Sequence, residues 1–203
     1  MPAPLDCIAC PLNQYRKTVV NGVIEGEGTP ELLIIGESPG YQEDQLGRPF
    51  IGPTGAILKQ ELGLRGIETY ALTNSMRCYP GDTKKDSEME AGLTACNPYL
   101  LQDIETLKPK VILALGAYAV RALGFDDPIT TIMCHILDGP YGVPVVVSYH
   151  PAAFMRQPGS LHLFELAVLK TKLLIHGERY GERWEPQVLT LEEFMKQARR
   201  GEG

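Results

Sequence analysis

Four short apolar runs constrain the fold of this chain more than any other feature of its sequence. They are ELLIIG (31–36), TYALTNS (69–75), KVILALG (110–116) and VPVVVSYH (143–150). Each run is largely continuous rather than alternating, which is typical of strands that are covered on both faces, as in parallel sheets. Stretches with helical patterns lie between the runs or after the last one, at 53–62, 87–107, 117–123 and 160–175. The alternation predicts a three-layer α/β/α sandwich with a central, mainly parallel, four-stranded sheet.

The chain has 203 residues, which is enough for one domain with a substantial core. The segment after Gly177 differs from the rest, because GERYGERWEPQ is polar and broken. The following TLEEFMKQARR pairs Thr190 with Glu193 in the spacing of a capping box, which predicts a short helix. We therefore expect one domain over 1–177 and a C-terminal extension with a short helix over 178–203.

The formal net charge is −6, which counts mildly against a polyanionic partner, since phosphate binding depends on Lys and Arg. A local basic patch on an acidic body would still permit such a partner. No run approaches the ~18 apolar residues expected of a membrane span. The N-terminal MPAPLDCIAC lacks the basic start and apolar run of a secretory signal. We expect a cytoplasmic monomer that does not associate with membranes.

Polar side chains stand where the predicted strands end. Glu37 and Ser38 follow the first run, Asn74 lies at the end of the second, and His150 ends the fourth. The carboxyl ends of parallel strands meet at one edge, which is where open α/β sheets bind ligands. An amide there can read the edge of a planar heterocycle, and a carboxylate can orient water or stabilise positive charge.

The segment IIGESPGYQEDQLGRPFIG (34–52) adds an aromatic ring and close-approach backbone to this edge. Phe50 can offer a flat face for stacking, and Gly36, Gly40 and Gly52 let a ligand come close to the main chain. Taken singly, each feature has a plainer reading: a solvated Glu, an Asn in a turn, a Phe in the core, a Pro-Gly turn. Only their joint placement favours a pocket for a planar, hydrogen-bonding ring.

The five cysteines are an odd number, which argues against a disulfide framework in a cytosolic chain. Cys134 lies in the apolar TTIMCHIL, so we expect it to be buried and inert. The other four form one C-x2-C pair and two distant singles, namely Cys7, Cys10, Cys78 and Cys96. They could bind zinc or hold an iron–sulfur cluster, and the wide separation of the singles slightly favours the cluster. Four unrelated thiols remain an alternative.

Together these motifs resemble the family 4 uracil-DNA glycosylases, the iron–sulfur type. The matching segments are GESPG with QED (36–44), GRPFIG (47–52), Thr73-Asn74 followed by Cys78, HPAAFMR (150–156) and the cysteine layout. The resemblance covers residues 5–176, and the combination is highly specific although no single motif is. It implies a monofunctional enzyme that hydrolyses the N-glycosidic bond of uracil in DNA during base excision repair and leaves an abasic site.

The resemblance also implies roles for matching residues. Glu37 resembles the carboxylate that positions water or stabilises the sugar cation, and His150 the histidine that stabilises negative charge on the departing uracil. The residues implied to bind the base are Gly36, Ser38, Glu43, Phe50 and Asn74. Among these, Phe50 is similar to the ring on which uracil stacks, and Asn74 to the amide that pairs with its edge. The four cysteines other than Cys134 resemble the ligands of a 4Fe–4S cluster.

The DNA contacts implied by the resemblance come from Arg48 and from the segment 152–156, which is similar to a loop that enters the minor groove. Phe154 or Met155 would fill the gap left by the base, and Arg156 would contact DNA beside them. The phosphate contacts would come from cations in or near these loops, namely Arg48, Arg77, Lys84, Lys85 and Arg156.

The sequence departs from the family pattern at a few positions. Ser38 stands where Ala or Gly is usual, Tyr41 replaces an acidic residue, and CYPGDTKKDSEM differs from the usual Arg-Pro-Pro run. These departures leave open a glycosylase of the same fold that acts on another damaged or modified base. A non-catalytic nucleic-acid-binding homologue is a further alternative. A related branch that cross-links covalently to DNA carries an inserted basic loop that ends in His. This chain has no such insertion, so we expect hydrolysis.

Overall fold

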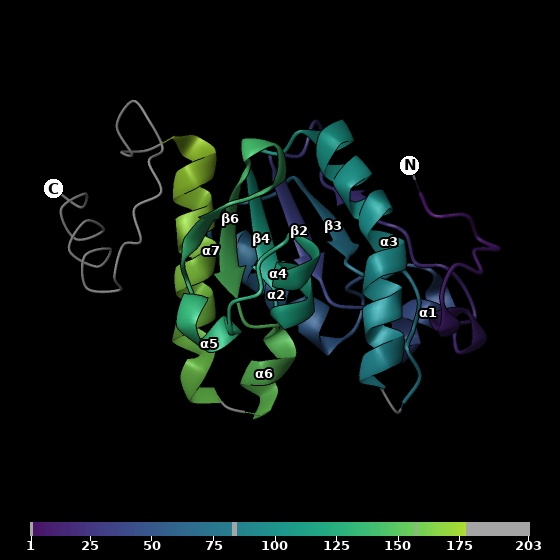
Figure 1. Cartoon of the computed structure of the whole chain (residues 1–203). Coiled ribbons are helices and arrows are strands. Elements are labelled where there is room, and N and C mark those ends of the chain that lie inside the picture. Colours follow the sequence, from purple (N-terminus) through teal and green to yellow (C-terminus); the bar gives the residue numbers. More distant parts are fainter. Residues whose placement is uncertain (1, 83–84, 157, 178–203) are drawn as a thin grey trace, which may run out of the picture.

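The computed structural model describes residues 2–82, 85–156 and 158–177. Its central sheet has six strands in the order β1-β3-β2-β4-β6-β5, of which Figure 1 labels β3, β2, β4 and β6. Its four middle strands are parallel: β2 (Leu32–Gly36), β3 (Tyr70–Asn74), β4 (Val111–Leu115) and β6 (Pro144–Ser148). They coincide with the four apolar runs. The predicted number of strands is wrong, because short antiparallel strands β1 (Val23–Glu25) and β5 (Ile136–Asp138) close the two edges.

The strand register explains why the apolar runs are continuous. Ile34 of β2 lies opposite Leu72 of β3 on one side and Leu113 of β4 on the other. Every residue of β2, β3 and β4 is buried, and only the first residue of β6 is partly exposed. A strand that is covered on both faces has no side on which polar residues are favoured.

The four predicted helices are present as α2 (Pro53–Leu64), α3 (Asp86–Leu107), α4 (Ala117–Ala122) and α7 (Leu161–His176). Three further short helices were not predicted: α1 (Tyr41–Leu46), α5 (Ile129–Ile132) and α6 (Pro151–Arg156). The helix predicted in the C-terminal extension lies outside the described residues. Within the described ranges, none of the helices combines the length and the apolarity needed to cross a lipid bilayer.

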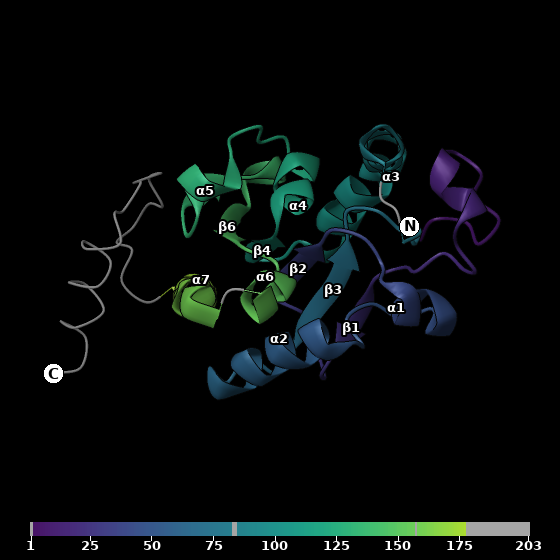
Figure 2. The same ribbon diagram turned by 90° about the horizontal axis from the view of Figure 1, so that it is seen from below.

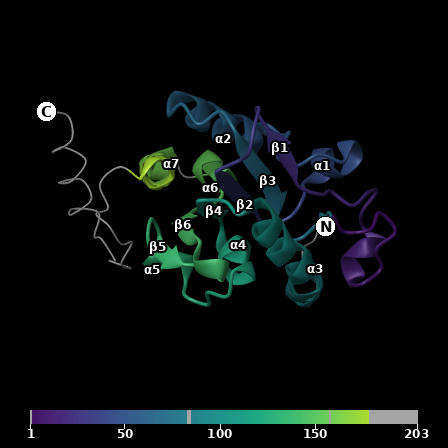
Figure 3. The same ribbon diagram turned by 90° about the horizontal axis from the view of Figure 1, so that it is seen from above.

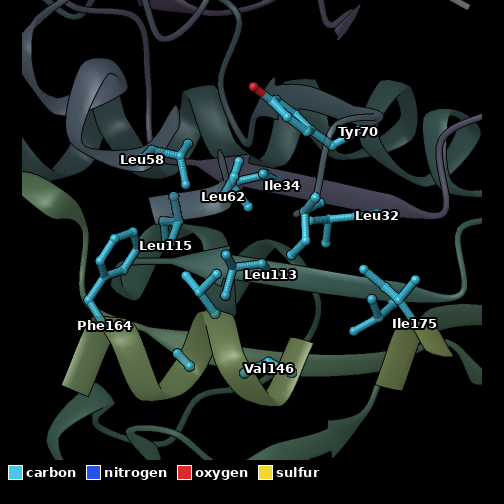
Figure 4. Packing of buried hydrophobic residues seen from close by; sticks show 14 of the residues in the cluster. Leu32, Ile34, Leu58, Leu62, Tyr70, Leu113, Leu115, Val146, Phe164 and Ile175 are labelled. Atoms are coloured by element: carbon cyan, nitrogen blue, oxygen red, sulfur yellow. The ribbon is translucent and has the colours of Figure 1, made fainter. Parts of the chain in front are cut away.

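Helices cover both faces of the sheet. Helices α2, α6 and α7 lie on one side and α3, α4 and α5 on the other (Figures 2 and 3). On the first side, Ile34 and Leu113 pack with Leu58 of α2 and Phe164 of α7 (Figure 4). The alternate residues of the same strands, such as Ile35, pack on the second side. The three-layer α/β/α sandwich is therefore confirmed.

Candidate active site

A cavity of about 410 Å³ opens at the edge of the sheet where the parallel strands end, and we term it the rim cavity. Its lining residues come from the segments after β2, β3 and β6 and from the start of α2. They are Glu37, Ser38, Pro39, Gly40, Glu43, Phe50, Thr54, Asn74, Tyr79, His150, Ala152 and Ala153. Figure 2 looks toward this edge, with α6 and α1 on opposite sides of the ends of β2 and β3. The predicted catalytic and base-binding residues lie together here.

Gly36 allows two of these residues to approach each other. It ends β2 directly beside Asn74, its partner on β3. A β-carbon at Gly36 would lie 2.4 Å from Asn74 Oδ1 and 2.7 Å from Phe50 Cζ. Because no real β-carbon tolerates such contacts, the absence of a side chain lets the amide and the ring share one corner of the rim cavity.

Phe50 is held in an unusual backbone conformation. Its φ is +54°, a region that non-glycine residues rarely adopt. The carbonyl of Phe50 packs against Gly55, where a β-carbon would lie 2.0 Å from that oxygen. The Phe50 ring faces the His150 ring at a centroid distance of 6.4 Å and an interplanar angle of 26°. Backbone strain of this kind is concentrated at functional sites, where it fixes a side chain in one place.

The His150 ring is oriented by the start of α6. The Ala152 backbone N–H donates to His150 Nδ1 at 3.3 Å, and the Ala153 N–H donates to the His150 carbonyl at 2.8 Å. Since Nδ1 accepts a hydrogen bond, the neutral ring carries its proton on Nε2. Nε2–H is the donor that His150 can offer to a ligand oxygen.

Two carboxylate residues connect neighbouring loops of the rim cavity. The Glu37 carbonyl accepts hydrogen bonds from the Met76 N–H at 2.9 Å and from Ser75 Oγ at 2.7 Å, so the loop after β2 is fixed to the segment after β3. Glu43 Oε1 accepts the Gly52 N–H at 3.2 Å, which links α1 to the segment that carries Phe50. The main chain of Glu37 and the carboxylate of Glu43 are therefore each held by a neighbouring segment.

Four thiols gather in a second region. Cys7, Cys10 and Cys78 pack around one small core with Leu12 and Met76, and the nearby Cys96 is buried on α3. Burial raises the pKa of the Cys78 thiol to about 12 against the lowering effect of a nearby guanidinium, and charges on the other three thiols also raise it. The four side chains are thus close enough to interact electrostatically.

That guanidinium belongs to Arg16. We term Arg16 and the four cysteines together the cysteine site. Arg16 Nη2 donates to the Leu5 carbonyl at 3.2 Å, while Nη1 is buried without a hydrogen-bond partner among the described residues. A buried cationic donor beside four thiols fits an anionic metal–thiolate group. No three His, Cys, Asp or Glu in the described part of the chain converge to hold a single ion. A cluster does not require that convergence, because each cysteine binds a different iron.

Comparison with known proteins agrees with this geometry. The model of the uracil DNA glycosylase superfamily matches residues 24–174. This chain belongs to that superfamily. A type-4 uracil-DNA glycosylase of Pyrobaculum aerophilum is 36% identical over 163 residues, covering 75% of this chain and 81% of its own length. The enzymes of the same name are 36% identical over 155 residues in Thermotoga maritima (74% and 78%) and 32% over 190 in Sulfurisphaera tokodaii (87% and 84%).

The residues predicted to contact DNA differ in how exposed their side chains are. Arg48 is exposed and forms an ion pair with Glu25 at 3.0 Å. Phe154 is only 4% exposed and packs against Phe164 at a ring-centroid distance of 5.3 Å. The Phe154 ring therefore lies in the core of this structure, and its predicted role as a wedge stays a prediction. The side chains of Met155 and Arg156 lie outside the described structure.

The prediction that Arg77 contacts phosphates is also wrong. Its side chain is 1% exposed and donates to Asp103 and Thr73 behind the sheet edge. Of the other proposed cations, Lys85 is exposed and pairs with Glu88 at 3.1 Å, and Lys84 lies outside the described residues. The Arg77 guanidinium is therefore turned into the protein and is not available at the surface.

Sequence reasoning missed three residues of the rim cavity or its support. Thr54 and Tyr79 line the cavity, and neither belongs to a strand end. Asp44 is buried and accepts the backbone N–H groups of Lys17 and Thr18, which fixes α1 against the N-terminal segment. The QED motif was a signal for Asp44, although its structural role depends on a partner 27 residues away.

Cys134 does not join the cysteine site. It is buried, as predicted, and its thiol donates to the Leu163 carbonyl at 3.2 Å on the α7 side of the sheet. Burial raises the pKa of this thiol to about 11. The thiol is therefore protonated at neutral pH, and its hydrogen bond explains a packing role.

Proposed function

We propose that this member of the superfamily is a uracil-DNA glycosylase, which hydrolyses the N-glycosidic bond of uracil in DNA and starts base excision repair. The observation that carries the proposal is the convergence of a carboxylate, an amide, an aromatic ring and an imidazole on one cavity of nucleobase size. The names of the type-4 relatives support the same substrate and reaction.

Binding comes first in the mechanism. A base inside a duplex must leave the stack, which costs a few kcal/mol that the pocket has to offset. Phe50 offers its ring as a stacking surface, and the Asn74 amide offers a donor and an acceptor to the polar edge of uracil. Gly36 supports this selection, since it lets the ring and the amide contact the same base.

Bond cleavage then separates charge. When the bond between the sugar C1′ and the base nitrogen breaks, its electron pair leaves with uracil and the sugar becomes cationic. The Nε2–H of His150 donates to the uracil oxygen on which negative charge grows. The Glu37 carboxylate stabilises the cation and accepts a proton from the water that attacks C1′. The uracil anion takes up the proton that Glu37 accepted from water, so the products are free uracil and an abasic sugar.

The test measures free base released from an oligonucleotide that contains one uracil. Glu37→Gln keeps the size of the side chain but removes its charge, so we expect kcat to fall by about 10²- to 10⁴-fold. Glu68→Gln, at an exposed position ahead of β3, is the matched control and should match the unmodified enzyme. Intact, metal-loaded protein that released no uracil from single- or double-stranded DNA would refute the proposal.

A second substrate is favoured by one observation. Ser38 lines the rim cavity, where its hydroxyl can hold water or contact a base that differs from uracil. A panel of oligonucleotides, each with one altered base, tests this reading. Faster release of a modified base than of uracil, lost in Ser38→Gly, would favour the alternative, and strict preference for uracil would exclude it.

We further propose that Cys7, Cys10, Cys78 and Cys96 hold a 4Fe–4S cluster. Three observations support this ligand set: the shared core of three of these cysteines, the burial of the fourth, and the lack of a partner for Arg16 Nη1 within the described ranges. When bound, the cluster would brace the segments that carry its ligands. A visible absorption band with about four irons and no zinc per chain supports the cluster. Zinc alone, or no metal, would refute it.

We infer that the enzyme acts on DNA as a monomer in the cytoplasm, with residues 1–177 as the catalytic domain. Light scattering during size-exclusion chromatography, with and without DNA, tests the oligomeric state. A truncated chain that ends at residue 177 should retain uracil release if the domain assignment is correct.

A further inference from the structure

Two tyrosines form an aromatic pair beside the rim cavity. Tyr79 follows β3 and lines the cavity, and Tyr41 is the first residue of α1. Their ring centroids lie 6.2 Å apart at an interplanar angle of 74°, an edge-to-face contact. Tyr41 is nevertheless 64% exposed. The pair therefore extends from the cavity wall to the outer surface.

Tyr79 is the fixed member of the pair. Its hydroxyl donates a hydrogen bond to Asp82, which orients the Tyr79 ring. A fixed ring whose neighbour is Tyr41 limits the positions that the Tyr41 ring can adopt, while the exposure of Tyr41 leaves ring surface open.

The position of the pair matters because an extruded nucleotide has neighbours on both sides. Helix α6, which follows His150, stands on one side of the strand ends, and α1 with Tyr41 stands on the other (Figure 2). Helices α1 and α6 therefore flank the strand ends past which DNA has to continue once one base enters the rim cavity. The exposed ring of Tyr41 lies on the α1 side.

The chemistry of the pair favours a base over a phosphate. The acidic side chains of Asp82 and Glu43 are next to Tyr79 or line the same cavity, and they repel phosphate groups. An aromatic ring attracts any nucleobase by stacking, because every base has a π-face. The expected ligand is thus the base of an adjacent nucleotide.

We propose that Tyr41, supported by Tyr79, is a stacking platform for the nucleobase next to the extruded one. The inference rests on the proposed glycosylase function and extends it to substrate choice. In single-stranded DNA the neighbouring base has no pairing partner and is free to stack on Tyr41. The enzyme should therefore depend most on this neighbour in single strands.

The test uses single-stranded oligonucleotides with one uracil, in which the 5′ or the 3′ neighbour is either adenosine or an abasic spacer. For the unmodified enzyme, the spacer on one side should lower kcat/KM for uracil release by on the order of tenfold. Tyr41→Ala should lower kcat/KM for the intact strand by a similar factor and lose its sensitivity to the spacer. Tyr41→Phe should behave as the unmodified enzyme, because the ring alone is sufficient for stacking.

The control variant is Tyr141→Ala. Tyr141 is 62% exposed, nearly as much as Tyr41, but it precedes β6 at the opposite edge of the sheet. The Tyr141→Ala enzyme should retain full sensitivity to the spacer. Tyr41→Ala could lower kcat/KM equally for the intact oligonucleotide and for the one with the spacer, or could change neither value. Either result would refute the stacking platform while uracil release persisted. If the unmodified enzyme released no uracil, the proposed function would fail first.

Discussion

The rim cavity and the cysteine site differ in how completely the chain itself satisfies their polar groups. In the rim cavity, the Glu37 carbonyl, His150 Nδ1 and Glu43 Oε1 all accept hydrogen bonds from neighbouring segments. In the cysteine site, the Cys78 thiol is buried, and the adjacent Arg16 Nη1 has no partner among the described residues. The first region is organised by protein alone, whereas the second has the chemistry of a site that an added anionic group stabilises.

The two regions are nevertheless connected through a short segment. Asn74 contributes to the rim cavity, and Cys78 belongs to the cysteine site. Between them, Met76 donates its N–H to the Glu37 carbonyl while its side chain lies in the core that contains Cys78. Disturbance of the cysteine site should therefore reach catalysis through residues 74–78, but more weakly than a change inside the rim cavity.

Among substitutions that leave every catalytic group in place, the largest effect is expected from Gly36→Ala. The added β-carbon displaces the Asn74 amide and the Phe50 ring, and misplacement by about 1 Å costs on the order of 10²-fold in rate. Steady-state kcat/KM for uracil release measures the loss. The visible absorption should stay unchanged, because the cysteine site is not touched.

Gly63→Ala is the matched control. Gly63 lies in α2 with no atom within 4 Å of the added β-carbon, so the substitution should keep activity and stabilise the helix by about 0.5–1 kcal/mol. Full activity of Gly36→Ala would contradict the structure assigned to the rim cavity.

The next effect is expected from Cys78→Ser. Because metal binding contributes folding free energy, loss of this ligand should reduce unfolding free energy by roughly 3 kcal/mol or more and bleach the visible band. Uracil release should fall about tenfold, less than for Gly36→Ala, through the displaced Met76 N–H. Absorption spectra, thermal unfolding and kcat/KM are the measurements. Cys134→Ser, at a buried thiol outside the site, should keep the band, and a band that persists in Cys78→Ser would disprove the ligand set.

A smaller effect is expected from Arg16→Gln. The guanidinium stabilises negative charge on the thiolates, so its removal should accelerate bleaching by an iron chelator about threefold while some band remains. The time course of absorbance in chelator measures this, together with iron content per chain. Arg65→Gln, which breaks an ion pair with Glu61 on α2, is the control and should bleach at the normal rate. Equal rates in both variants would remove Arg16 from the cysteine site.

The predictable parts of the fold are those that neighbouring residues in the sequence determine. The parallel strands show themselves as continuous apolar runs because both faces are buried. Strands β1 and β5 have three residues each, and only their pairing with β3 and β6 defines them. The convergence of Glu37, Asn74 and His150 was predictable for a related reason, since each lies at or just after the carboxyl end of a parallel strand.

The errors concern side chains whose direction depends on distant partners. Arg77 is buried because Asp103, 26 residues away, accepts its guanidinium, and nothing next to Arg77 in the sequence indicates this. Phe154 faces the core because residues 151–156, which were expected to form a loop, form the helix α6 and place the Phe154 ring against Phe164 of α7. The positive φ of Phe50 arises from its packing on Gly55, which no local pattern predicts.

The smallest expected effect concerns the outer brace of the rim cavity. Glu25 on β1 accepts hydrogen bonds from Arg48 at 3.0 Å and from Lys59 at 3.1 Å, and Arg48 stands two residues before Phe50. Burial raises the pKa of Glu25, but the hydrogen bonds and charges of these two cations outweigh it and leave the pKa below its ordinary value of 4.5. The ionised carboxylate therefore stabilises the folded state.

The sign of its pH dependence follows from that depressed pKa. The contribution of Glu25 is fully present above the unfolded pKa near 4.5 and is lost as the pH falls through the folded value. Because Arg48 is exposed and Lys59 is only half-buried, we expect Glu25→Gln to cost only about 0.5 kcal/mol of unfolding free energy at neutral pH, with the difference vanishing as the pH falls through the lowered pKa of Glu25. Urea unfolding across this range measures it, with Glu68→Gln as control. A difference that stayed constant with pH would mean that Glu25 acts by packing, and the main-chain hydrogen bonds to Glu37 and Glu43 would then hold the rim cavity without ionic help.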